Sequence, residues 1–141
     1  LNRLIIKQTK SRSRKTNDQA LVEGKNGSVI RKHIGRNHIP KKYADPINIF
    51  YQKYFNPFLN YHRICSFATN YTDKREKIKK KYNIHLTPYD KLKSLKNAKR
   101  YLKEEITFEI LDKMAYAKSD IEAGEEMKKE KSKVFRTIKI N

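Results

Sequence analysis

The residue whose type and surroundings best suggest chemistry is Glu23, in the stretch TNDQALVEGKNG at residues 16–27. Five basic residues flank it in the sequence: Lys10, Arg12, Arg14, Lys15 and Lys25. A carboxylate can hold a divalent cation, and a basic surface around it can hold phosphates. The other interpretation is that Glu23 is a surface residue that balances Lys25, because a lone carboxylate is seldom a site.

A helix must position Glu23. Asn17–Asp18 can cap the start of this helix, and Gly35 is a typical stop. Gly24 and Gly27 lie inside it, although glycine in a helix interior costs about 1 kcal/mol relative to alanine. The helix face beside Glu23 is therefore small and open, as if another molecule approached it closely.

The other expected elements follow from caps, prolines and hydrophobic spacing. Residues 4–9 have the composition of a strand. An aromatic stripe from Phe50 to Phe58 predicts a helix that begins at Asp45–Pro46 and is kinked or broken at Asn56–Pro57. Hydroxyl caps predict three further helices: from Thr87 to about Leu95, from Thr107 to about Lys118, and from Ser119, with Glu122 completing a capping box, to about Ile138.

The order of residues in TKSRSRKTNDQALVEGKNGSVIRKHIG (9–35) strongly resembles the end of the catalytic core of bacterial DDE-type transposases with an integrase-like catalytic region. The resemblance continues through IPKKYADPINIFYQKYFNPFLNYHR (39–63) and LTPYDKLKSL (86–95). It implies an RNase H-like α/β parent fold, in which Glu23 matches the third acidic residue of the DDE triad. No acidic residue precedes Asp18, which matches the cap of the Glu helix, so the two triad aspartates are absent.

The resemblance also implies a mechanism. Three carboxylates of such a site hold two divalent cations about 4 Å apart, which activate the attacking and leaving oxygens of a phosphoryl transfer. The expected ion is Mg²⁺, with Mn²⁺ as a substitute, and Glu23 would be the ligand supplied by this chain. Lys25 and Asn26 would position DNA phosphates beside the metals. With one carboxylate of three, the chain alone is expected to be inactive.

The charge of the chain indicates the class of its binding partner. The chain of 141 residues has 34 Lys and Arg against 15 Asp and Glu, a net charge of +19. Residues 1–40 hold 10 basic and 2 acidic residues, residues 74–103 hold 12 and 2, and residues 104–130 hold 4 and 9. This segregation favours a polyanion, with nucleic acid first and an anionic membrane surface second. No apolar run approaches the roughly 20 residues that span a bilayer.

Other candidate residues have simpler interpretations. The four histidines are too scattered for a metal signature, and His62 is expected to pack or to form a hydrogen bond. Cys65, the single cysteine, excludes an internal disulfide and is expected to be a small buried hydrophobe. The aromatic stripe could stack bases, but its helical spacing favours a core. The Lys77–Lys81 run is either a solvated face or a phosphate contact.

The sequence therefore predicts the C-terminal part of a DNA transposase, mostly α, with the last core strand, the Glu helix and a helical extension. Its expected parts are 1–63, the end of the catalytic core; 64–86, a basic linker; and 87–141, the helical extension. Expected partners are transposon-end and target DNA, with no membrane. We expect the intact enzyme to be oligomeric and cytoplasmic, associated with the nucleoid. The alternative is a small basic nucleic-acid-binding protein without catalysis.

Overall fold

The computed structural model describes Arg12, Gly24 and residues 26–138. These residues fall into two compact units that divide after Pro40. The strand expected at residues 4–9 and the expected start of the Glu23 helix lie outside the described residues.

The first unit contains a helical segment that ends at Gly35. Turns of the wider π type over Asn26–Arg31 (η3) lead into α2 (Lys32–Ile34). Gly35 has a φ of 92°, a value that favours glycine, and its N–H donates to the carbonyl of Arg31 at 3.0 Å. The expected helix end at Gly35 is confirmed.

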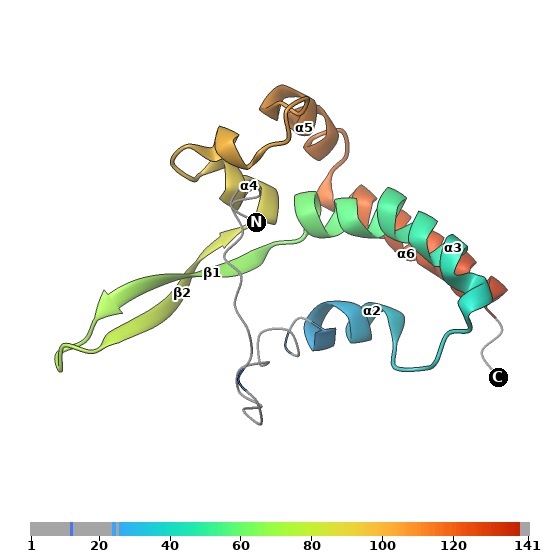
Figure 1. Ribbon diagram of the computed structural model, residues 1–141, viewed down its shortest axis with the longest axis horizontal. Helices are drawn as coiled ribbons and strands as arrows, with labels where there is room; N and C mark the ends of the chain where they lie inside the picture. Colours follow the sequence, from blue (N-terminus) through green and yellow to red (C-terminus); the bar gives the residue numbers. More distant parts are fainter. Residues whose placement is uncertain (1–11, 13–23, 25, 139–141) are drawn as a thin grey trace. The chain divides into compact units, whose positions relative to one another are not determined.

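The second unit places a β-hairpin between helical segments (Figure 1). The strands are β1 (Cys65–Thr72) and β2 (Ile78–Leu86), which pair antiparallel. The helical segments, in chain order, are η4 (Lys41–Tyr43), α3 (Ala44–Phe50), η5 (Tyr51–Phe55), η6 (Phe58–His62), α4 (Pro88–Lys93), η7 (Ala98–Tyr101), α5 (Phe108–Ala115) and α6 (Asp120–Thr137).

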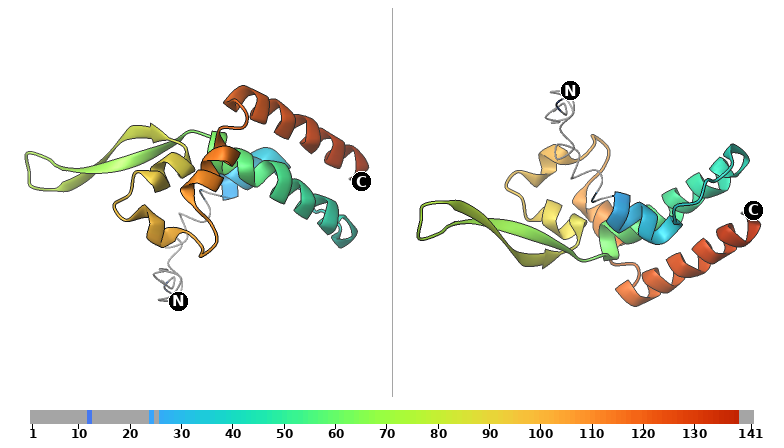
Figure 2. Two further views of the ribbon diagram at one scale, coloured as in Figure 1. Left: turned by 90° about the horizontal axis from the view of Figure 1, so that it is seen from above. Right: turned by 90° about the horizontal axis from the view of Figure 1, so that it is seen from below.

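The segments η4 to η6 form one helical run, residues 41–62, that lies antiparallel to α6 (Figures 1 and 2). Phe50 and Phe55 are each 1 % exposed, and Met127 of α6 is 3 % exposed. His62, the last residue of the run, joins it to the start of α6: its side chain is buried, and its Nδ1 lies 3.0 Å from a carboxylate oxygen of Asp120. The aromatic stripe is therefore core, and His62 forms a structural hydrogen bond, as expected.

The start of this helical run differs from the expectation. The α-helix begins at Ala44, so Asp45 lies inside the first turn instead of capping it, and Tyr43 at the cap position makes no side-chain cap hydrogen bond. The expected cap at Asp45 is wrong. Pro46 is still accommodated, because N–H groups in the first turn of a helix have no intrahelical acceptor.

Proline does not break the run in its middle. Asn56 and Pro57 both keep right-handed helical angles. The Asn56 N–H donates to the carbonyl of Tyr51, and the Arg63 N–H donates to that of Phe58, each a spacing of five residues. This wider hydrogen-bond pattern accommodates a residue without an N–H. Of the expected kink or break at Asn56–Pro57, the break is absent, and the helix type changes locally instead.

The remaining helix starts were predicted well. The Thr87 hydroxyl accepts a hydrogen bond from the Asp90 N–H at 3.0 Å, with Pro88 as the first helical residue. Thr107 caps α5 in the same way. Ser119 and Glu122 form the expected capping box of α6. These three caps are confirmed, because a cap depends on chemistry within one turn of chain.

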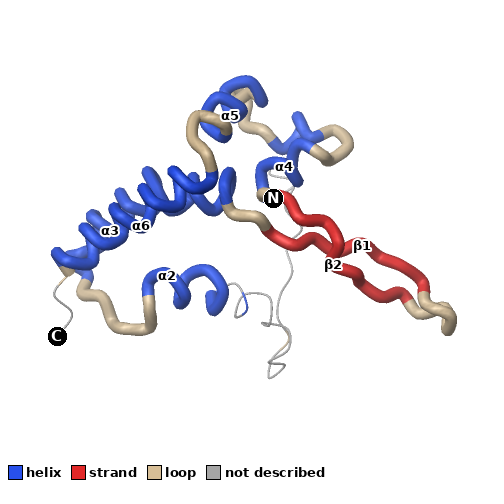
Figure 3. The backbone as a smooth tube through the Cα atoms, turned by 180° about the vertical axis from the view of Figure 1, so that it is seen from behind, coloured by secondary structure: helices blue, strands red, loops and turns tan. Residues whose placement is uncertain are grey.

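The expected basic linker over 64–86 contains a β-hairpin, which was not predicted and is seen as the long two-stranded ribbon of Figure 3. In this hairpin Cys65 lies opposite Leu86 at the base and Thr72 lies opposite Ile78 near the turn. The register of the pairing shifts between Phe67 and Ala68. This shift marks a β-bulge, which leaves Asn83 as the extra residue of β2.

The hairpin turn spans Asp73 to Lys77. The Asp73 N–H donates to the Lys77 carbonyl and the Glu76 N–H donates to the Asp73 carbonyl, both at 3.0 Å. The Asp73 carboxylate accepts from the N–H of Arg75 at 2.8 Å and of Lys77 at 3.0 Å. Glu76 has a φ of 57°, the left-handed value that such three-residue loops need at this position.

Candidate nucleic-acid interface

The residues predicted to form a metal and DNA site lie mostly outside the described residues. Those residues are Lys10, Arg14, Lys15, Glu23 and Lys25. Arg12 and Asn26 are described, and both are exposed. Their grouping around the Glu23 carboxylate therefore stays a prediction.

Two glycines beside Glu23, Gly24 and Gly27, have open space around them. A Cβ built on Gly24 or Gly27 would meet nothing within 4 Å. Neither glycine has a φ in the left-handed range. Packing in the described part of the chain therefore gives no reason for glycine at these positions, and an open surface is left next to position 23.

An open depression in the first unit begins at Asn26. Its lining includes two further basic residues, Arg31 and Arg36, and a second amide, Asn37. Arg31 and Arg36 are exposed. Guanidinium and amide groups of this kind can bind phosphate oxygens, so Asn26 lies on a surface suited to a nucleic-acid backbone. Sequence reasoning missed the two arginines; the signal was a basic residue on either side of the helix stop.

The β-hairpin carries the densest basic charge of the second unit. Between residues 73 and 81 there are six basic and two acidic residues. Asp73 faces inward to the turn, since its side chain is 14 % exposed and forms an ion pair with Lys79 at 2.8 Å. Lys79, followed by the backbone N–H groups of Lys77 and Arg75, holds the pKa of this carboxyl below its usual range. The carboxylate thus stabilises the turn while the hairpin stays cationic.

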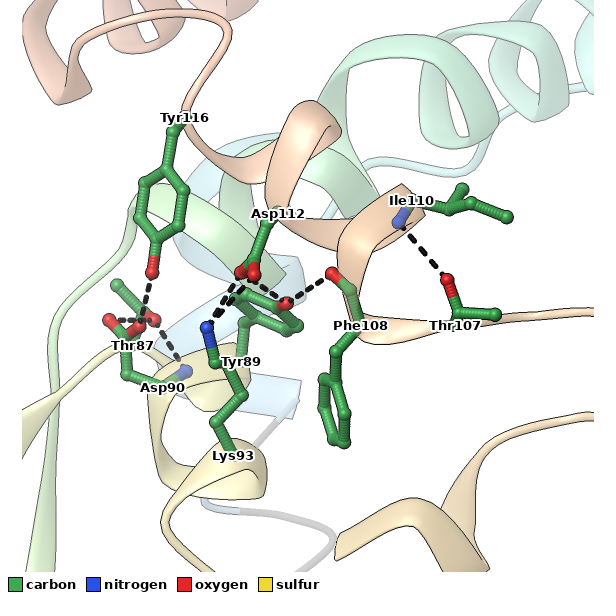
Figure 4. A network of polar contacts seen from close by, with 9 residues as sticks. All are labelled: Thr87, Tyr89, Asp90, Lys93, Thr107, Phe108, Ile110, Asp112 and Tyr116. Atoms are coloured by element: carbon green, nitrogen blue, oxygen red, sulfur yellow. Dashed lines mark hydrogen bonds and ion pairs between the residues drawn. The ribbon is translucent and has the colours of Figure 1, made fainter.

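A polar network anchors the base of the hairpin (Figure 4). Strand β2 ends at Leu86, one residue before the Thr87 cap of α4. The buried Tyr89 hydroxyl donates to Asp112 of α5 at 2.7 Å, and Lys93 Nζ donates to both oxygens of the same carboxylate at 2.8 and 3.1 Å. Helix α4 is therefore held on α5, and the hairpin emerges from a fixed base.

The electrostatics of this network indicate structure rather than catalysis. Hydrogen bonds from Lys93 and then Tyr89 lower the pKa of Asp112, and the Asp112 carboxylate raises that of Lys93. Burial, followed by the hydrogen bond to Asp112, raises the pKa of Tyr89 well above its ordinary value. At neutral pH the network therefore holds a neutral phenol, a carboxylate and an ammonium, each satisfied by another.

The histidines and the cysteine do not assemble a site in the part of the chain that the structure describes. Cys65 is half-buried, and its thiol donates to the Arg63 carbonyl at 3.8 Å. His85 pairs with Ser66 across the hairpin at 3.1 Å. Among the described residues, no three His, Cys, Asp or Glu side chains are close enough to share a metal ion.

No helix among the described residues combines the length and the apolar character that a membrane crossing requires. Comparisons with protein-family models, with curated proteins and with solved structures give no match to this chain.

Proposed function

We propose that this chain is the C-terminal part of a DDE-type DNA transposase, in which Glu23 is a ligand of a two-metal centre. The chain would contribute Glu23 and basic surfaces that hold DNA, and the two aspartates would come from the preceding part of the enzyme. Mg²⁺ is the expected ion, with Mn²⁺ as a substitute. The enzyme would act on DNA as an oligomer, in the cytoplasm at the nucleoid.

The observation that carries this proposal is the order of residues 9–35. A basic loop, an Asn-Asp cap, a Glu-x-Lys-Asn turn and a terminal glycine follow one another there. The helix end at Gly35 and the exposed Asn26 agree with that order. The open space at Gly24 and Gly27 adds support, because DNA and metal would need close access to this side of the helix.

The first test is to read the DNA upstream of the Leu1 codon. An open reading frame with two aspartates on strand-like segments, the second some tens of residues before Glu23, supports the proposal. A reading frame without such a pair contradicts it.

The second test is chemical and uses the longer protein. Glu23→Gln should abolish Mg²⁺-dependent strand cleavage while duplex binding changes little, because the amide is a far weaker metal ligand than a carboxylate of the same size. The chain of 141 residues alone should cleave nothing with Mg²⁺ or Mn²⁺. Metal-dependent nicking by this chain that disappears in Glu23→Gln would overturn the expectation that the aspartates are needed.

A second candidate function is a basic nucleic-acid-binding protein without catalysis. The hairpin favours it, because a cationic ribbon on an anchored base can bind a polyanion without any metal centre. The two candidates differ in one measurement. In the longer protein, only the transposase requires the Glu23 carboxylate for strand cleavage.

A further inference from the structure

We propose that the β1–β2 hairpin enters the major groove of duplex DNA and lays one defined face against the base edges. This surface is separate from the predicted metal site. The choice of DNA as the nucleic acid rests on the proposed function, whereas the surface itself is defined by the described residues of the hairpin.

The two faces of the hairpin differ in what covers them. Residues that are Cα partners share a face, and alternate pairs point to opposite sides. The inner face begins with Phe67 and Ile84, which are half-buried, and Lys91 of α4 lies over the Phe67 ring at 5.7 Å. Beyond the Ser66–His85 pair at its base, the outer face consists of Ala68, Asn70, Thr72, Ile78, Lys80 and Tyr82, all exposed.

The outer face has the composition of a contact surface. Its β1 side carries only small side chains, which allow a close approach to the backbone. Its β2 side carries large ones: Ile78 is 75 % exposed and Tyr82 is 62 % exposed. Figure 2 shows the hairpin extending beyond α4 and α5, and all six of these residues are exposed, so no described element of the second unit covers this face.

The shape and charge of the hairpin match the major groove. This groove admits a two-stranded β-ribbon, and amide, hydroxyl, ammonium and methyl groups are what contact its base edges. Asn70, Thr72 and Lys80 supply the first three of these on the outer face, and Ala68 supplies a methyl group. Lys81 lies on the opposite face, from which its long side chain can reach phosphates at the groove edge, and the turn is basic, so phosphates along the groove would meet positive charge.

Duplex DNA is favoured over single strands by the spacing of aromatic side chains. Binding of single strands uses rings on which successive bases stack. The two exposed tyrosines of the hairpin, Tyr71 and Tyr82, lie on opposite faces, so they cannot form one stacking platform.

The first experiment measures the salt dependence of binding. The full chain is titrated onto a short fluorescent duplex of mixed sequence at several salt concentrations. Lys80→Ala with Lys81→Ala should make the log–log slope shallower by about 0.9, since Lys81 is assigned to one phosphate, each phosphate contact contributes about 0.9, and Lys80 is assigned to the base edges. The matched control is Lys128→Ala with Lys129→Ala, two exposed lysines of α6. Equal changes in the two double variants would mean diffuse attraction and would overturn the proposal.

The second experiment distinguishes the two faces. Tyr82→Ala removes an exposed ring from the outer face, and Tyr71→Ala removes one from the inner face. We expect Tyr82→Ala to weaken duplex binding about tenfold and Tyr71→Ala less than twofold. The reverse order, or no effect of either, refutes the assignment of the outer face. Two-dimensional amide spectra of both variants identify a hairpin that has lost its fold, and in that case Tyr82→Phe and Tyr82→Ser are compared instead.

The third experiment identifies the groove. Dimethyl sulfate methylates guanine N7 in the major groove and adenine N3 in the minor groove. The bound chain should protect N7, and the Lys80 and Lys81 double variant should lose this protection. Protection of N3 alone, protection of neither, or equal affinity for single-stranded DNA or RNA would overturn the proposal. None of these results depends on Glu23, so failure here and failure of the metal-site test are separate outcomes.

Discussion

Replacing Gly124 of α6 by alanine should stabilise the protein, because this glycine lies in the interior of a helix with room for a methyl group. A Cβ at position 124 would lie 3.5 Å from Cε2 of Phe58, an ordinary van der Waals contact. Alanine gains about 1 kcal/mol of helix propensity over glycine. Burial of the methyl group against Phe58 adds roughly 0.5 kcal/mol, less than the 0.8 kcal/mol of a fully buried methylene.

The expected increase in the free energy of unfolding is therefore about 1.5 kcal/mol. Urea denaturation followed by far-ultraviolet circular dichroism measures it directly, and the Tm should rise by about 5 °C. In a Phe58→Ala background, Gly124→Ala should keep its propensity gain of about 1 kcal/mol and lose the contact gain. The difference is the coupling energy of the pair.

A loss of stability in Gly124→Ala would refute this reasoning. It would mean that α6 and the helical run 41–62 approach each other more closely at this point than the 3.5 Å contact indicates. Equal effects of Gly124→Ala with and without Phe58 would contradict only the contact contribution.

Three further predictions concern the hairpin and its base. Tyr89→Phe should lower the free energy of unfolding by about 1.5 kcal/mol in urea, because it removes a buried donor to a carboxylate. Asp112 has a lowered pKa in the folded protein, so its contribution to the free energy of unfolding is complete above the ordinary Asp pKa of about 3.9 and is lost as the pH falls through the folded pKa. The free energy of unfolding measured below about pH 4 should therefore fall more steeply in the parent protein than in Asp112→Asn. Glu76→Gly should raise the unfolding free energy by about 1 kcal/mol in urea, because glycine adopts a positive φ without the strain that a glutamate has there. A decrease would show that the turn does not constrain this residue.

The helix starts were predictable from the sequence because their chemistry is local. Thr87, Thr107 and Ser119 each accept a hydrogen bond from an N–H three residues later. The core role of Phe50 and Phe55 was also predictable, since helical spacing gathers them on one face. The cap expected at Asp45 failed because a turn of helix precedes it.

The hairpin was not predictable, for three physical reasons. Lysines on both faces of β2 conceal the alternation that normally indicates a strand. The bulge at Asn83 shifts the alternation by one residue in mid-strand. The turn uses Glu76 where glycine or asparagine would indicate a hairpin. The metal site at Glu23 was proposed from residue order and stays a prediction.

The pairing of the run 41–62 with α6 has a consequence for limited proteolysis. These helices are the first and last of the second unit, so the hairpin, α4 and α5 are all inserted between two segments that hold each other. A cut at the exposed residues 103–106 would leave the run 41–62 on one fragment and α6 on the other. The Phe50, Phe55 and Met127 core and the Tyr89–Asp112 hydrogen bond would still join the fragments. A nicked chain should therefore migrate as one particle in native conditions and separate only in denaturant.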